Sequence, residues 1–162
     1  MWLVALICVI IFAVFYISSL PSNEEVNAIL DLRAKEAGFP GFHPTIELSY
    51  SVSVDEQNKL FSYTDNSGKF RVSPLSNFYR VDVWGYRCKN KGVGFSVSDE
   101  VLRCERGGFE LQGEIYLYAS YIDNTGQGRH FEVKFTGLSG AKKALDYQKR
   151  INTLIEQLRQ RK

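Results

Sequence analysis

The chain has 162 residues, of which 20 are basic and 18 acidic, so its formal net charge is +2. Once an apolar N-terminal stretch is set aside, this length provides one domain with a hydrophobic core but not two. The near balance of charge argues against a nucleic-acid partner. A content of 9 Tyr, 11 Phe and 13 Gly beside 4 Pro favours strands joined by tight turns.

The stretch from Trp2 to Leu20 carries no charged side chain and is long enough to cross a bilayer as a helix. We predict a transmembrane anchor over residues 1–21, because Pro21 closes the apolar run. This predicts a single-pass, signal-anchored protein of the bacterial cell inner membrane, with membrane lipid as one partner. The candidate membrane-anchoring residues are Trp2, Phe12, Phe15 and Tyr16.

A cleaved signal peptide is the alternative to this anchor. It is disfavoured because no Lys or Arg precedes the apolar stretch and no Ala-x-Ala site follows it. A lipoprotein signal ending at Cys8 is disfavoured as well, since no basic residue precedes that cysteine. Arg33 and Lys35 follow the stretch closely, which places the body of the protein on the cytoplasmic side.

Residues 22–44 are predicted to form a short helix and a linker. Ser22 and Glu25 have the spacing of a capping box, and apolar residues at helical spacing follow them as far as Gly38. The segment from Gly38 to Pro44 contains two glycines and two prolines, which continue neither a helix nor a paired strand. We therefore place a domain boundary there.

Residues 45–162 are predicted to form one mainly antiparallel β domain of about seven strands. The first strand is expected across Ile46 to Val54, where apolar and polar residues alternate. Turn residues at Asp65 to Gly68 and at Asp123 to Gly128 separate later strands. These later strands are expected at Lys59–Thr64, Lys69–Ser73, Phe78–Trp84, Phe95–Cys104 (as one or two short strands), Glu114–Tyr121 and His130–Phe135.

A long amphipathic helix is predicted to close the chain, opening with Ser139 as its N-cap. Its apolar side would pack on the sheet, and its basic side is either a solvated helix face or a site for anionic headgroups. The expected apolar side holds Ala144, Tyr147, Ile151, Leu154, Ile155 and Leu158. The candidate residues for binding an anionic surface are Lys142, Lys143, Lys149 and Arg150.

This α+β layout, with about seven antiparallel strands capped by a C-terminal helix, resembles the pleckstrin-homology-like barrel. In particular, the stretches from Lys59 to Trp84 and from Phe131 to Leu158 look like those of uncharacterised bacterial membrane-anchored proteins with such a domain. The resemblance covers about two thirds of the chain and implies a scaffold that binds headgroups, peptides or a neighbouring membrane protein. The basic cluster in the first hairpin that binds phosphoinositides in that fold has no counterpart around Asp55 to Lys59.

The sequence contains no catalytic or metal-binding constellation. His43 and His130 are its two histidines, and neither stands at metal-ligand spacing, so we predict no metal and no cofactor. The stretch from Gly137 to Ala141 resembles a Gly-x-Ser-x-Gly elbow but ends in alanine, and no histidine follows it. Cys88 and Cys104 could pair only if they face each other outside the cytoplasm. No spacing brings together the carboxylates of Asp99, Glu100, Glu110 and Glu114.

We therefore predict a membrane-anchored, non-enzymatic binding module that contacts a protein partner or the membrane surface. The alternatives are a small membrane-tethered hydrolase and an immunity or exclusion protein acting on another membrane component. Exposed aromatic residues gathered in one place would favour binding. Converging carboxylates, or His130 beside Ser139, would favour the enzyme.

Overall fold

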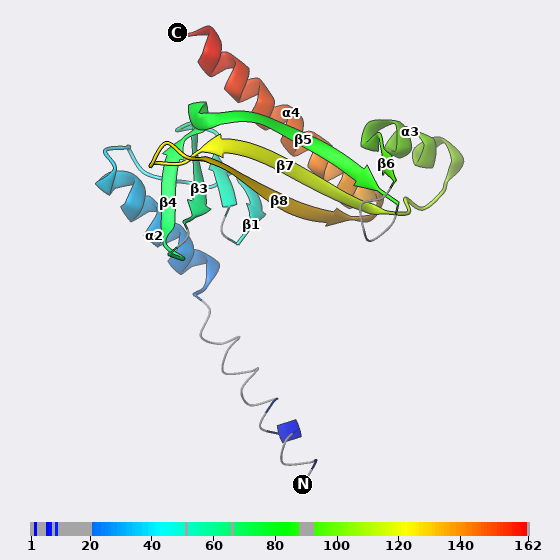
Figure 1. Cartoon of the computed structure of the whole chain (residues 1–162), viewed down its shortest axis with the longest axis horizontal. Coiled ribbons are helices and arrows are strands. Elements are labelled where there is room, and N and C mark those ends of the chain that lie inside the picture. Colours follow the sequence, from blue (N-terminus) through cyan, green and yellow to red (C-terminus); the bar gives the residue numbers. More distant parts are fainter. Residues whose placement is uncertain are drawn as a thin grey trace.

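The computed structural model describes residues 2, 6, 7, 9, 21–50, 52–65, 67–87 and 93–161. Within these ranges the strands form two four-stranded antiparallel sheets, ordered β1-β2-β3-β4 and β6-β5-β7-β8 (Figure 1). The helices are α2 (Asn23–Glu36), α3 (Val97–Gly107) and α4 (Gly137–Gln160), with a short 3-10 turn at Leu75–Asn77. The strands are β1 (Ile46–Ser49), β2 (Val52–Asp55), β3 (Leu60–Thr64), β4 (Phe70–Pro74), β5 (Phe78–Tyr86), β6 (Gly94–Phe95), β7 (Glu114–Ile122) and β8 (Gly128–Thr136).

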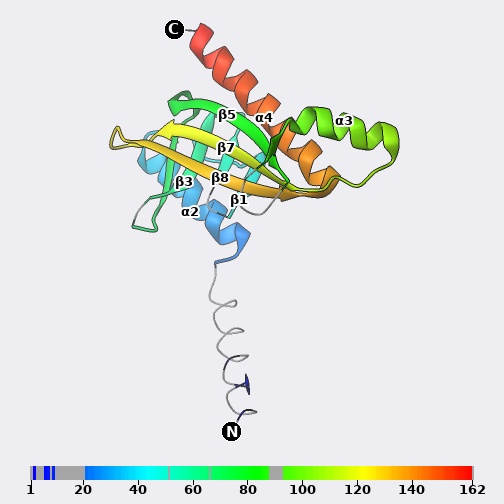
Figure 2. The same ribbon diagram turned by 45° about the vertical axis from the view of Figure 1, so that its right-hand side comes forward.

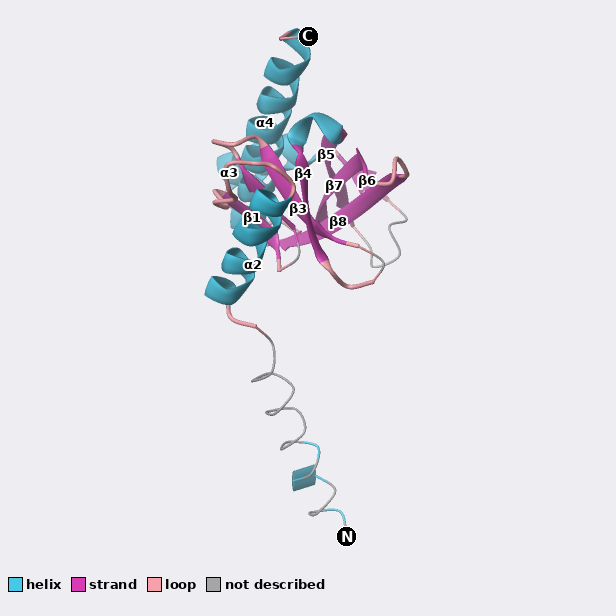
Figure 3. Cartoon of the chain, turned by 90° about the vertical axis from the view of Figure 1, so that its left-hand side faces the viewer, coloured by secondary structure: helices cyan, strands magenta, loops and turns pink. Residues whose placement is uncertain are grey.

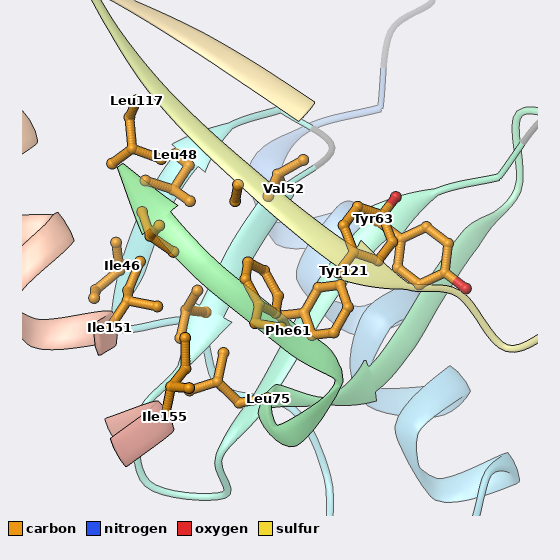
Figure 4. Packing of buried hydrophobic residues seen from close by; sticks show 14 residues of the cluster. Ile46, Leu48, Val52, Phe61, Tyr63, Leu75, Leu117, Tyr121, Ile151 and Ile155 are labelled. Atoms are coloured by element: carbon orange, nitrogen blue, oxygen red, sulfur yellow. The ribbon is translucent and has the colours of Figure 1, made fainter. Parts of the chain in front are cut away.

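The main hydrophobic core lies between the two sheets and α4. The ring of Phe61 on β3 meets the ring of Phe78 on β5 edge-on at 4.3 Å. It also meets the ring of Tyr121 on β7 at 5.1 Å (Figure 4), so aromatic contacts join the sheets. Ile151 and Ile155 of α4 are buried in the same cluster, and α4 runs along one side of the strands (Figure 3). The helix therefore covers one face of the β5-β7-β8 sheet and leaves the other face outward.

Helix α2 begins as predicted. The Glu25 amide donates to the Ser22 hydroxyl at 3.3 Å, and the Ser22 amide donates to the Glu25 carboxylate at 2.7 Å, which completes the capping box. The buried residues of this helix are Val26, Leu30 and Ala34, which share a cluster with residues of β3 and β4. Burial of this apolar stripe holds α2 against the first sheet.

The predicted transmembrane anchor is wrong. Among the helices in the described ranges, none is both long enough and apolar enough to cross a bilayer. The prediction of a signal-anchored, single-pass protein of the inner membrane is wrong for the same reason. Most of the predicted anchor, including all of residues 10–20, lies outside the described residues. Trp2 is 93% exposed, whereas Phe12, Phe15 and Tyr16 lie outside the described residues.

The predicted long first strand is instead a hairpin. Ser49 pairs with Val52 and Ile46 pairs with Val54, so β1 turns back into β2. Every residue of β2 is buried, including the polar Ser53, whose hydroxyl lies 2.8 Å from that of Ser62 on β3. Polar side chains that are hydrogen-bonded in this way can be buried on either face of a strand. The alternation of apolar and polar residues therefore did not indicate which residues face solvent.

The segment predicted as short strands around residues 95–104 forms the two-residue strand β6 followed by α3. The Ser96 hydroxyl accepts the Asp99 amide at 3.4 Å as the helix N-cap, and Val97, Val101 and Cys104 form the buried side of the helix. Acidic residues in the first turn favour this helix through its dipole. The cap, the helical spacing and packing beside α4 together outweigh the strand propensity of the valines.

The C-terminal helix was predicted correctly in its apolar face but not in its start. Thr136 is the N-cap, without a side-chain hydrogen bond, and the helix runs from Gly137, so Ser139 lies within its first turn. Ala144, Ile151 and Ile155 are buried as expected. Tyr147, Leu154 and Leu158 are partly buried against the same core.

Two hairpin tips share the pattern Tyr-x-Asp-Asn-Ser/Thr-Gly-x-x-Arg, at residues 63–71 and 121–129. In the first, the Asp65 carboxylate accepts the Ser67 hydroxyl at 2.6 Å and the Arg71 Nε–H at 2.8 Å. These bonds close the turn between β3 and β4. The hydroxyl and then the arginine hold the pKa of Asp65 well below its ordinary value.

The second tip repeats this arrangement between β7 and β8. The Asp123 carboxylate accepts the Thr125 hydroxyl at 2.6 Å and the Arg129 Nε–H at 2.9 Å, and the hydroxyl contributes most to lowering its pKa. The two tips touch, because the rings of Tyr63 and Tyr121 lie 5.1 Å apart. The repeated hairpin thus joins the same end of both sheets.

Acid should destabilise the protein through these two tips. The folded pKa of Asp65 and of Asp123 lies below the ordinary value of 3.8, so each carboxylate stabilises the fold above that pH. This contribution is lost as the pH falls from about 4 downward, because the carboxylates of the unfolded chain take up protons there while those of the folded protein stay ionised. We expect the urea midpoint to fall between pH 6 and pH 3, and to fall less in an Asp65→Asn/Asp123→Asn double variant. Equal slopes for the two proteins would contradict this assignment.

Candidate functional site

The outward face of the β5-β7-β8 sheet is the candidate site, and we call it the open face. It is formed by alternate residues of three strands whose register is continuous across the sheet. In Figure 2 the three strands lie in front of α4. The cross-strand rows are Arg80–Ser120–His130, Asp82–Tyr118–Glu132, Trp84–Tyr116–Lys134 and Tyr86–Glu114–Thr136.

Aromatic side chains occupy the middle of the open face. Trp84 lies beside Tyr116 in the register and is 54% exposed. The rings of Tyr86 and Tyr116 meet edge-on at 6.0 Å, and the rings of Tyr118 and His130 stack at 5.5 Å. Tyr and Trp are enriched at protein interfaces because they bury large areas with little loss of side-chain entropy.

Hydrogen bonds position the central tyrosine. The Tyr116 hydroxyl donates to the Glu114 carboxylate at 2.7 Å, and Lys134 forms an ion pair with the same carboxylate. The bond to Glu114, with burial and the negative charge of that group, raises the pKa of Tyr116 to about 12. Tyr116 therefore stays protonated, and its ring is the part that it presents to a partner.

Charges on the open face are mixed and partly neutralised. Arg80 Nε lies 2.7 Å from an oxygen of Asp82, and Lys134 pairs with Glu114. No single sign of charge dominates the rows, so this face has no field that would attract a polyanion. Its chemistry suits a partner surface that offers apolar area and a few polar groups.

Two hollows lie away from the open face. One, of about 310 Å³, lies between α2 and the β1-β2 hairpin and is lined by Val26, Leu30 and Leu48 among others. The other, of about 300 Å³, lies beside α3, and its wall includes Glu100 and Arg103. In the second hollow Arg103 donates to Glu100 at 2.6 Å and lowers its pKa, so this carboxylate is held ionised by an ion pair.

The residues considered for catalysis do not converge. His130 lies near the start of β8 and Ser139 follows its end, so an extended strand of about 20 Å separates them. Glu100 pairs with Arg103, and Glu114 pairs with Lys134. Within the described ranges, no group of three His, Cys, Asp or Glu residues is placed to hold a metal ion.

Three of the four basic residues predicted on α4 to bind an anionic surface form separate contacts. Lys142 lies 2.6 Å from Glu105 of α3, and Arg150 pairs with Glu56 of the β2-β3 turn. Lys143 lies over the ring of Tyr147 at 5.4 Å, while Lys149 is exposed. Acidic neighbours thus neutralise part of this basic face.

The histidines and cysteines have ordinary surroundings. His43 is an exposed residue of the loop after α2, and its backbone amide donates to Asp55 at 2.8 Å. Cys104 is a free thiol buried on the inner side of α3. Cys88 lies outside the described residues, as does Cys8.

The sequence interpretation missed the aromatic residues of the open face. The strands β5 and β7 were predicted, but their outward aromatic residues were not among the predicted binding residues. The signal was present, because Tyr116 and Tyr118 alternate with the buried Leu117 and Ala119, and Trp84 alternates with Val83 and Gly85. Aromatic residues on the side of a strand opposite its buried residues indicate an exposed binding surface.

No protein-family model, curated protein or solved structure matches this chain.

Proposed function

We propose that this protein is a non-enzymatic binding module that contacts a protein partner through the open face. The observation that supports this most directly is the group formed by Trp84, Tyr116 and Tyr118 in two neighbouring rows of one outward sheet surface. A monomeric domain gains little by exposing aromatic rings side by side, whereas an interface gains both area and rigidity from them.

The aromatic side chains of the open face are also held in place by contacts within the protein before a partner binds. Glu114, which is paired with Lys134, accepts the hydrogen bond of Tyr116, and His130 stacks on Tyr118, so these rings need little reordering on binding. Preorganised side chains lower the entropic cost of association. The resemblance to the pleckstrin-homology-like barrel implies the same class of role and remains a prediction.

Site-specific photo-crosslinking tests this proposal. A benzophenone amino acid replaces Tyr118 at the centre of the open face or, in the control, Tyr50 between β1 and β2, which is 49% exposed. We expect one protein to crosslink in cells at Tyr118 and not at Tyr50. Crosslinking only at Tyr50, or the same products at both positions, would contradict the proposal.

A further inference from the structure

Among the residues that the structure describes, β8 is a long edge strand. It pairs with β7 in nine consecutive positions without a bulge, and β7 is its one strand neighbour in the described part of the chain. Figures 1 and 2 show it as the outermost strand of its sheet. Edge strands are usually protected by bulges, proline, charged side chains or shortness, because their free N–H and C=O groups attract other strands. β8 contains no proline.

The inner side of β8 is incompletely covered. Phe131, Val133 and Phe135 point toward the core but are only partly buried. Their register partners on β7, which are Ala119, Leu117 and Ile115, are fully buried. An apolar row of this kind gains free energy when a further strand is added beside it, because more apolar area leaves water.

We infer that β8 pairs with β8 of a second copy of this chain, antiparallel about a two-fold axis at Val133. In this register Glu132 of each copy faces Lys134 of the other, and Phe131 faces Phe135. Both Glu132 and Lys134 are exposed on the open side of the strand. The pairing therefore makes two cross-strand pairs of opposite charge.

Charge selects this register over its neighbours. An axis at Glu132 would place two glutamates directly opposite, and an axis at Lys134 would place two lysines opposite, and like charges in these positions are destabilising. Only even steps of register keep the open faces of both copies on the same side of the sheet. The axis at Val133 thus satisfies the strand geometry and the charges together.

Such a dimer joins two four-stranded sheets into one sheet of eight strands. The two open faces then lie side by side on one surface, with His130 of each copy close to the junction. This inference does not depend on the partner proposed above, since β8 would pair through its backbone.

A charge-reversal series tests the inference with the full chain. Sedimentation velocity should show a dimer for the unchanged protein, and Glu132→Lys should weaken it by about tenfold or more, because two attractive pairs become repulsive. Lys134→Glu should weaken it similarly. A mixture of Glu132→Lys with Lys134→Glu should restore the dimer as a heterodimer, since every facing pair is again opposite in charge.

The mixture separates the inference from misfolding, because a variant that fails to fold cannot be rescued by another variant. Circular dichroism of each single variant provides the folding control. Finding only monomers at a protein concentration of tens of micromolar would overturn the inference. That result would fit an edge strand that pairs with a strand of another protein. A dimer whose stability is unaffected by either charge change would overturn the inference as well.

Discussion

Replacing Asp55 with alanine is expected to lower the free energy of unfolding by about 3 kcal/mol. Asp55 is 0% exposed, and its carboxylate accepts the His43 amide at 2.8 Å, the Asn58 amide at 2.9 Å and the Asn58 side-chain amide at 2.8 Å. Alanine would leave these donors without an acceptor at the point where the loop after α2 meets the β2-β3 turn. Thermal and urea unfolding measure the effect, and we expect a fall of roughly 10 °C in Tm.

Two further variants sharpen this test. Asp55→Asn should cost nearly as much, because its NH₂ group would face another N–H donor where an oxygen is required. Asp82→Ala, which removes a surface ion pair with Arg80 on β5, should change stability by about 1 kcal/mol or less. An Asp55→Asn protein as stable as the unchanged chain would show that these hydrogen bonds do not hold the loop.

Replacing Trp84 with alanine is expected to weaken partner binding by about 30-fold or more, which corresponds to about 2 kcal/mol for a central aromatic anchor. Trp84 is already half exposed and packs beside Tyr116 on the sheet surface. Its loss should therefore change folding stability by at most about 1 kcal/mol. Affinity for the partner captured by crosslinking, measured by calorimetry, checks the expected loss.

Tyr79→Ala is the matched control for this variant. Tyr79 lies on the same strand and is also 54% exposed, but it sits at the bulge between Phe78 and Arg80 and not in the rows of the open face. We expect its replacement to leave affinity unchanged, and Trp84→Phe to retain most of it. Equal losses for Tyr79→Ala and Trp84→Ala would show that the effect does not arise from the open face.

Much of the strand order was predictable because its signals are local. The turn residues at Asp65 to Gly68 and Asp123 to Gly128 predicted the hairpins that join β3 to β4 and β7 to β8, and both hairpins form there. The prediction of one first strand was wrong because the apolar alternation continues through the turn of a hairpin. The chain reverses between Ser49 and Val52, yet the apolar residues on both sides of the turn are buried, namely Ile46, Leu48, Val52 and Val54.

The predictions of the transmembrane anchor and of short strands at the position of α3 were wrong for different reasons. A long apolar stretch predicts a membrane span from length and composition, but most of that stretch lies outside the described residues, and no helix in the described ranges is long and apolar enough to cross a bilayer. The segment at Val97 to Cys104 contained both strand-forming valines and a helix cap at Ser96. Packing of its apolar side beside α4 favours the helix, and local propensity alone does not.

The sequence by itself determined where α2 is capped, where the hairpins turn and which side of α4 is apolar, because each depends on residues within a few positions of one another. Only the tertiary structure decided which face of the β5-β7-β8 sheet is covered. Helix α4 packs on the side of Val81, Leu117 and Ala119, and the aromatic rows are left outward. The alternation of a strand defines two faces, but the element that packs across them decides which one meets a partner.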